Sequence, residues 1–365
     1  MGGRGFVSAL DTPPDVADEI EALFREARQR RRRRWVAGAL ILLVVLASAA
    51  VGIAVARSGS HSPRPAHVQA GLPEWSAQPG SRIAPPAEFV TGDNKGGIGV
   101  YSTASGKLIR ELSAQTNGGP DQQPAPSAGG SSVYFVRPQG ACAASIQTIP
   151  ISGSQQSVTA VSVPGTIALD PAPSPDSGVL AWVGSVCGSV GAQPTLYLSN
   201  QATGQRSDLG PYTGRPNDNG IAWSHDGALL AVEAAPIVKV LDARDLSKPA
   251  QLLTVRPGCM LTDPVFASFN DQLAVIRTCF ATSSEQGSSD VVIYSAKTGH
   301  ALALAAKAPQ EVNFQSLSID PSGHVLVGLS PINGSAETAL LNRGRLVTIS
   351  DQAPTGAQWI TAGRT

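Results

Sequence analysis

The sequence predicts an all-β domain of the propeller type, with six four-stranded blades, carried by one transmembrane helix. Two observations lead to this prediction. An uncharged apolar run occupies residues 35–56, and two kinds of hairpin-like unit alternate along residues 85–361. Between them, residues 57–84 are rich in Ser, Pro and Gly. The chain therefore divides into an N-terminal tail (1–34), a membrane segment (35–56), a stalk (57–84) and a propeller (85–361).

The tail is rich in arginine and has one apolar stripe. Residues 1–34 carry eight Arg against six acidic residues, and five of the Arg are consecutive at 30–34. The apolar residues Val16, Ile20, Leu23, Phe24 and Ala27 recur at helical spacing. We therefore expect a short amphipathic helix, and residues 13–34 are candidates for binding a cytosolic partner or anionic lipid. The simpler interpretation is that the arginines only set the membrane topology.

Residues 35–56 have the length and composition of a membrane-spanning helix. At about 1.5 Å per residue, this charge-free run covers the roughly 30 Å hydrocarbon core. Arginines cluster on its N-terminal side, so the positive-inside rule places the tail in the cytoplasm and the large domain outside. A cleaved signal peptide is the alternative, because Ala47–Ala49 and Ala54–Ala56 resemble cleavage sites. The long charged tail and the length of the run favour a retained anchor.

The charge distribution excludes one class of partner for the large domain. The net charge of the chain is zero, and residues 58–365 carry 18 basic against 21 acidic side chains. A slightly acidic domain is not suited to binding nucleic acid. Arg outnumbers Lys 21 to 6, which is typical of a GC-rich bacterial genome.

The propeller prediction depends on two alternating units. The first is a strand, a tight turn with Pro, Asp or Gly, and an apolar strand, and it occurs at 124–136, 171–183, 221–232, 264–276 and 317–329. The second is a strand, a turn such as Thr-Gly or Ser-Gly, and another strand, and it occurs at 98–112, 145–161, 195–209, 237–255, 290–304 and 339–349. First units start roughly 45 to 50 residues apart, a blade-like period. One unit of each kind supplies the four strands of a propeller blade.

Counting the second unit predicts six blades. The first blade lacks a first unit, but Ala353–Ile360 at the C-terminus resembles a single inner strand. We expect this strand to complete the first blade and close the ring, which leaves no free sheet edge there. Seven blades remain an alternative if residues 72–90 contribute more strand.

The tight turns carry a family resemblance. Ser174-Pro175-Asp176-Ser177-Gly178 and Ser224-His225-Asp226-Gly227, with a small-residue strand before and an apolar strand after, resemble the WD40-like repeats of TolB-type β-propellers. The resemblance covers about residues 85–361 and rests on the repetition more than on any single turn. True WD40 signatures are missing, and a membrane anchor departs from soluble periplasmic TolB.

Long, variable loops are expected on one face of the propeller, and binding residues favour such loops. The candidate ligand-binding residues there are Tyr212, as a stacking side chain, and Arg215, Asn217 and Asp218. Residues entering neighbouring blades can ring the channel, and these are Asp170, Asp263 and Glu311. Solvated loop residues are the plain alternative.

All four cysteines lie beyond the membrane segment, in a compartment that permits disulfides. Three pairings are open from the count alone. Cys142 and Cys187 occupy equivalent loops of neighbouring blades, while Cys259 and Cys279 flank one inner hairpin. We therefore predict the pairs Cys142–Cys187 and Cys259–Cys279.

The predicted function is a binding or scaffold module of the bacterial cell envelope, with an extracytoplasmic protein or glycan as partner. We identify no catalytic residue, cofactor or metal ligand, because no histidine has a second ligand at metal spacing and no nucleophile motif occurs. Two alternatives stay open. One is a propeller hydrolase or lactonase with a metal at the channel mouth, and the other is a sensor that signals through the cytoplasmic helix.

Overall fold

A computed structural model describes residues 72–75, 83–92, 95–152, 156–187, 192–215, 219–267, 271–280, 288–331, 334–342, 345–350 and 356–361. The predicted tail helix and membrane segment lie outside these residues. Within them, no helix has the length and apolar character needed to cross a membrane. The compact unit that contains the strands spans Gly71–Thr365.

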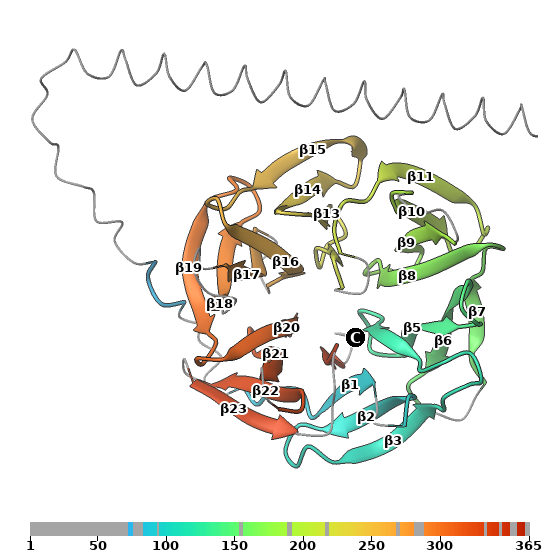
Figure 1. The fold of residues 1–365 in the computed structure, drawn as a ribbon, viewed down its shortest axis with the longest axis horizontal. Coiled ribbons are helices and arrows are strands. Elements are labelled where there is room, and N and C mark those ends of the chain that lie inside the picture. The colour runs from blue at the N-terminus through green and yellow to red at the C-terminus, as the bar shows by residue number, and fades with distance from the viewer. Residues whose placement is uncertain are drawn as a thin grey trace, which may run out of the picture. The chain divides into compact units, whose positions relative to one another are not determined.

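The described residues form 24 strands in antiparallel meanders of four, placed around a common centre (Figure 1). We call each meander a blade and number the blades along the chain. Blade 1 consists of β24 (Gln358–Trp359), β1 (Glu88–Gly92), β2 (Ile98–Ser102) and β3 (Leu108–Ser113), and blade 2 of β4 (Gln122–Pro126), β5 (Ser132–Pro138), β6 (Ala144–Pro150) and β7 (Val158–Val161). Blade 3 consists of β8 (Thr166–Pro173), β9 (Val179–Val186), β10 (Thr195–Asn200) and β11 (Arg206–Pro211), and blade 4 of β12 (Ile221–Trp223), β13 (Leu229–Ala234), β14 (Ile237–Asp242) and β15 (Asp245–Leu253). Blade 5 consists of β16 (Cys259–Phe266), β17 (Gln272–Cys279), β18 (Ser288–Ser295) and β19 (Ala301–Lys307), and blade 6 of β20 (Val312–Ile319), β21 (Val325–Pro331), β22 (Glu337–Asn342) and β23 (Arg345–Ser350).

Apolar clusters lie between neighbouring blades. One such cluster joins blades 5 and 6 through Ile276, Ile293, Leu317 and Val327, all buried. Another joins blades 1 and 2. Each blade buries both of its faces against neighbouring blades. Its central strands are therefore continuous apolar runs, without an alternation of apolar and polar residues. Blades 2 and 3 are also joined by a single parallel residue pair at the edge of β6 and β8.

The tight turns that carry the family resemblance have a common hydrogen-bond pattern. The Ser174 hydroxyl donates to the Asp176 carboxylate at 2.5 Å and accepts the Val179 N–H at 3.0 Å. Ser224 and Asp226 repeat this pattern in blade 4. Hydrogen bonds to the ionised form lower the pKa of Asp176, with the Ser174 hydroxyl the largest cause and the Gly178 N–H the next. The turn residues are therefore fixed by local side-chain chemistry.

The C-terminal strand completes the first blade, as predicted. Strand β24 pairs with β1 through Phe89 with Trp359 and Val90 with Gln358. The Trp359 indole N–H donates to the His324 carbonyl in blade 6 at 3.0 Å, and its side chain is buried. Strand β24 thus contacts blade 1 through backbone pairing and blade 6 through the buried Trp359 side chain.

One segment of the predicted stalk contacts the propeller. Residues 72–75, expected in the stalk, lie against β19 of blade 5, with Glu74 and Leu304 forming a parallel bridge. Tertiary contacts therefore order a segment that has no strand pattern in its sequence.

Candidate functional site

A cavity of about 680 Å³ lies at one mouth of the central channel. Its lining comes from the starts of inner strands and from the long loops, so the cavity lies on the face where the sequence placed a ligand site. The volume is within the range of about 300–1,000 Å³ that is usual for ligand sites. Five carboxamide side chains line the cavity, and they belong to Gln122, Gln123, Asn219, Asn313 and Gln315.

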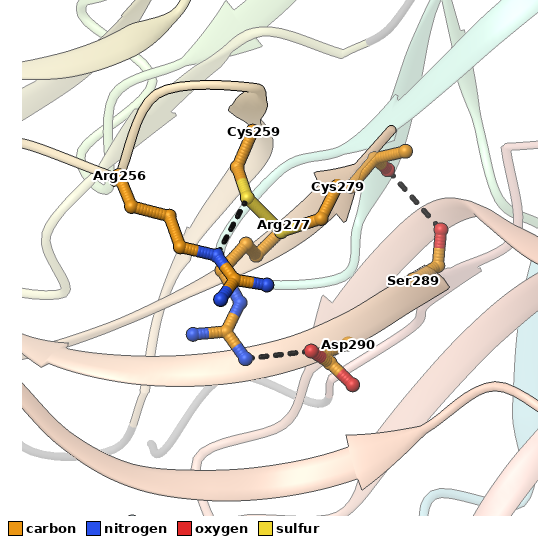
Figure 2. The surroundings of a disulfide bond; sticks show 7 residues. Arg256, Cys259, Arg277, Cys279, Ser289 and Asp290 are labelled. Atoms are coloured by element: carbon orange, nitrogen blue, oxygen red, sulfur yellow. Dashed lines mark hydrogen bonds and ion pairs between the residues drawn. A yellow bond between two sulfur atoms is a disulfide. The ribbon is translucent and has the colours of Figure 1, made fainter. Parts of the chain in front are cut away.

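A disulfide borders this cavity in blade 5. Cys259 and Cys279 are directly opposed on β16 and β17 and are bonded to each other (Figure 2). Their chain neighbours Met260 and Phe280 line the cavity, and Phe280 is 52% exposed. The bridge therefore holds two wall residues at the ends of two strands. The second disulfide joins Cys142 to Cys187, so both predicted pairings are confirmed.

Three inner strands bend at the same place. Gln123, Asp170 and Asp263 each stand four residues before the tight turn of their blade and have positive φ angles of 52°, 51° and 49°. Strand pairing is interrupted by a bulge at each of them. A bulge re-aims the side chain that it carries. Apart from glycine, residues with positive φ are uncommon, and aspartate is among the residue types enriched there. Gln123 and Asp263 thereby line the cavity.

Gln123 and Asp170 tie two neighbouring inner strands together. The Gln123 amide N–H donates to the Asp170 carboxylate, and its carbonyl oxygen accepts the Asp170 backbone N–H at 2.9 Å. Both residues are buried. Asp170 of blade 3 therefore holds the Gln123 side chain in one orientation, and Gln123 fixes the position of its inner strand at the cavity.

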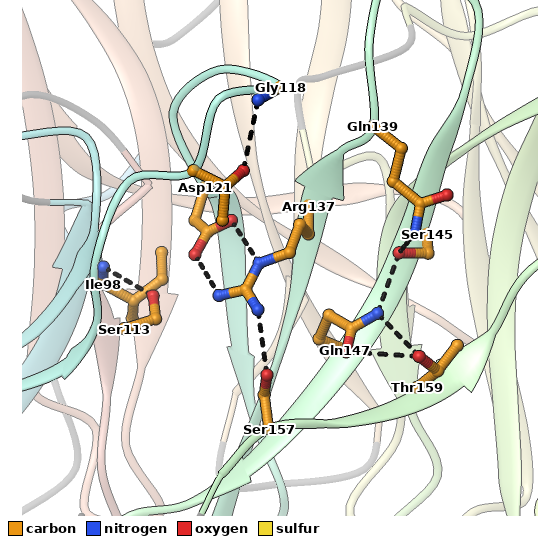
Figure 3. A network of polar contacts seen from close by, with 11 residues as sticks. Ile98, Ser113, Gly118, Asp121, Arg137, Gln139, Ser145, Gln147, Ser157 and Thr159 are labelled. Carbon is orange, nitrogen blue, oxygen red and sulfur yellow. Dashed lines mark hydrogen bonds and ion pairs between the residues drawn. The ribbon is translucent and has the colours of Figure 1, made fainter.

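An ion pair supports the blade 2 side of the cavity. Asp121 accepts two hydrogen bonds from the Arg137 guanidinium, 3.0 Å from Nε and 2.7 Å from Nη2 (Figure 3). Arg137 also donates to the Ser157 hydroxyl at 2.9 Å. The Asp121 backbone N–H donates to the Gly96 carbonyl of blade 1 at 2.8 Å. Because both carboxylate oxygens are engaged, Asp121 fixes the loop and offers little to a ligand.

Arg215 is the cation of the cavity wall. Its backbone N–H donates to the buried Glu233 carboxylate at 3.0 Å, which fixes the loop, while the side chain is exposed. Within the described part of the chain, its guanidinium makes no hydrogen bond or ion pair, and the same holds for the side-chain amides of Gln122 and Gln315. These three side chains are among the polar groups of the described cavity wall that the fold leaves available to a ligand.

No protein-family model matches this chain, and no curated protein matches it. Among solved structures, a TolB-type protein from Agrobacterium tumefaciens is similar with a TM-score of 0.50 and 13% identity, covering 73% of this chain and 89% of that one. TolB from Acinetobacter baumannii is similar with a TM-score of 0.49 and 15% identity, covering 75% of this chain and 66% of that one. The chain has a TolB-like β-propeller fold. At this level of identity, the similarity describes the fold of the propeller and not its ligand.

The propeller places the predicted site residues at different depths. Arg215 and Asp263 line the cavity, and Asp170 lies beneath it, 1% exposed. Tyr212 is 2% exposed and packs against Gly214 and Gly220, so its ring is not accessible for stacking on a ligand.

Of the three remaining predicted positions, the described residues contain Glu311 alone, which does not line the cavity. Glu311 is exposed and precedes β20, and blade 6 contributes Asn313 and Gln315 in its place. Asn217 and Asp218 lie outside the described residues. Among the described residues, no group of three or more His, Cys, Asp or Glu side chains is arranged to hold a metal ion.

Sequence reasoning missed most of the carboxamides. A usable signal was present for Gln123, because Gln123-Pro124, Asp170-Pro171 and Asp263-Pro264 occupy the same place in their repeats. Gln122, Asn313 and Gln315 have no local pattern. They meet only because inner strands of different blades converge on one channel.

Proposed function

We propose that this protein is a membrane-tethered β-propeller of six blades that binds an extracytoplasmic partner at the cavity of the channel mouth. The observation that carries the proposal is this cavity, with Arg215, Gln122 and Gln315 uncommitted on a wall that other contacts hold in place. Preorganised polar groups around a concave site favour binding, because little ordering is needed when the ligand arrives.

The tether is proposed from residues 35–56 and from the arginines before them. In this arrangement the propeller acts outside the cell membrane, and the tail remains in the cytoplasm. A protein or a glycan of the cell envelope is the proposed partner. Mass measurement of the mature chain from membranes distinguishes a retained anchor from a cleaved signal peptide. Protease treatment of intact spheroplasts then tests on which side the propeller lies.

Site-specific photo-crosslinking in membranes tests the cavity. The full chain carries the photoreactive residue in place of Phe280, on the cavity rim, or in place of Val347, which is 47% exposed on the outer strand β23. We expect a discrete adduct from position 280 and none from position 347. Arg215→Glu should reduce the adduct because it reverses the only uncommitted charge that the described cavity wall presents. Arg244→Glu, an exposed arginine in the β14–β15 turn, is the matched control and should leave the adduct unchanged.

These variants, together with Asp263→Asn and a deletion of residues 13–34, distinguish binding from the alternative functions. If position 280 yields no adduct, or if the two arginine variants behave alike, then the cavity is not the binding site. Turnover of esters or lactones that Asp263→Asn abolishes would replace the binding proposal with the hydrolase. Loss of a cellular response on deletion of residues 13–34, with crosslinking intact, would add signalling to binding.

A further inference from the structure

Residues 72–75 lie along the outer edge of blade 5. The Trp75 backbone N–H donates to the Leu304 carbonyl at 2.8 Å, and the Leu304 N–H donates to the Pro73 carbonyl at 2.9 Å. Glu74 faces Leu304 in parallel register. The segment thus occupies the position of a fifth strand next to β19.

Two apolar side chains anchor this segment on either side of the blade. Leu72 packs against the cluster between blades 4 and 5, and Trp75 packs against the cluster between blades 5 and 6. Pro73 and Glu74 between them are exposed. The two backbone hydrogen bonds set the parallel register of the segment on β19. Burial of the Leu72 and Trp75 side chains stabilises this short strand.

Among the outer strands of the six blades, β19 has the least protection against pairing with another strand. Natural sheet edges are protected by charges, by proline or by shortness. Charges stand on β3 (Arg110 and Glu111), β11 (Arg206 and Asp208) and β23 (Arg345), and β15 contains Pro249. Strand β7 has four residues. Strand β19 reads Ala-Leu-Ala-Leu-Ala-Ala-Lys, so its seven residues have no charge before the last.

The chain is held again just before it enters blade 1. The His324 ring Nε2 lies 3.0 Å from the Ile83 carbonyl oxygen, and its Nδ1 lies 2.8 Å from the Asp320 carboxylate in the first turn of blade 6. The Ile83 side chain itself is 57% exposed. Residues 72–83 are therefore attached to the propeller at both ends.

We propose that the outer edge of β19 is a strand-acceptor site and that residues 72–75 are the strap that keeps it closed. A second extended segment with an apolar residue and a tryptophan three positions later fits the same edge when the strap is displaced. The strap also sets the point where the chain leaves the propeller. While it is docked, the tether to the proposed anchor comprises only residues 57–71.

The strap is tested by amide hydrogen exchange on the full chain in detergent micelles. Trp75→Ala removes the main anchor but leaves the backbone donors in place. We expect the Leu304 amide to exchange about ten-fold faster or more in this variant, because local opening of the edge becomes easier. Ile83→Ala truncates an exposed apolar side chain that lies outside both clusters, so Leu304 exchange should not change. The Leu326 amide, in the core of blade 6, reports whether the fold as a whole is intact.

A peptide of residues 69–78 tests whether the edge accepts a strand in trans. The labelled wild-type peptide should bind the Trp75→Ala chain and show little binding to the wild-type chain, whose own strap is present at a high effective concentration. A peptide with the Trp75→Ala change is the matched control and should bind neither chain. Equal Leu304 exchange in wild type and Trp75→Ala, or equal binding of the wild-type peptide to both chains, would overturn the proposal.

Discussion

Replacing Arg137 by methionine should leave a carboxylate without a counter-ion inside the wall of the cavity. The Asp121 side chain is fully buried, and the Arg137 side chain is 20% exposed. Removing one partner of a buried ion pair costs about 3–5 kcal/mol, because the remaining charge keeps its desolvation penalty. Partial exposure of Arg137 favours the lower end, so we expect about 3 kcal/mol for Arg137→Met. Methionine keeps much of the apolar stem of arginine but loses the guanidinium carbon, which lies 5.0 Å from the centroid of the Phe135 ring.

Urea unfolding of the full chain in detergent micelles, followed by tryptophan fluorescence, measures this loss. Asp121→Asn combined with Arg137→Met removes both charges, so the double variant should lose only about 1–2 kcal/mol. Arg110→Met is the surface control. Its partner Glu88 is 3.7 Å away with both side chains about one-third exposed, and such pairs contribute about 0–1 kcal/mol.

The double variant decides the interpretation. If it is as unstable as Arg137→Met, then the loss arises from packing and not from an unpaired carboxylate. If Arg137→Met costs no more than Arg110→Met, then the Asp121 wall is solvated and the reasoning about burial is wrong.

Three further changes test the turn, the rim and the ring closure. Ser174→Ala should raise the pKa of Asp176 toward its ordinary value near 3.8, as measured by NMR titration. In the wild type, ionised Asp176 contributes its full stabilisation above that ordinary value, and the contribution is lost as pH falls through the lowered pKa of the folded state. The variant should therefore show a weaker dependence of stability on pH in the acid range. An unchanged titration of Asp176 would contradict the assigned hydrogen bond. Cys259→Ala with Cys279→Ala should reduce unfolding stability by about 2–5 kcal/mol. A reductant should lower the Tm of this variant by less than the Tm of the wild type, because the variant has only the Cys142–Cys187 bridge left to lose. Trp359→Ala should cost about 3–5 kcal/mol in urea unfolding, and a loss below 1 kcal/mol would show that β24 does not close the ring.

The strand pairs were largely predictable because their signals are local. Apolar alternation and turn residues act within about fifteen residues, and the same signals recur in every repeat. Repetition also made neighbours predictable, which is why the pairing of Cys142 with Cys187 followed from their equivalent loops. The closing strand near Trp359 was predicted in the same way, because one hairpin lacked its partner.

The sequence does not determine which loop side chains reach the cavity, because that depends on the depth of each side chain. Tyr212 and Arg215 stand in the same loop, yet two glycines let the tyrosine pack into the core, while the arginine stays exposed. Glu311 was named because it enters its blade at a position comparable to Asp170 and Asp263, but the bulge in β20 falls at Gln315. Small local shifts of this kind are not visible in a hydrophobic pattern.

The sequence by itself determined the fold class, the hairpin repeat, the closing strand and the disulfide partners, since each of these follows from short-range chemistry repeated along the chain. Only the tertiary structure decided which side chains share the cavity and where residues 72–75 dock. Convergence of inner strands brings together carboxamides that stand far apart in sequence. An exposed β19 edge likewise orders a Pro-containing segment that has no strand propensity of its own. Both outcomes depend on distances across the propeller, and no window of the sequence contains those distances.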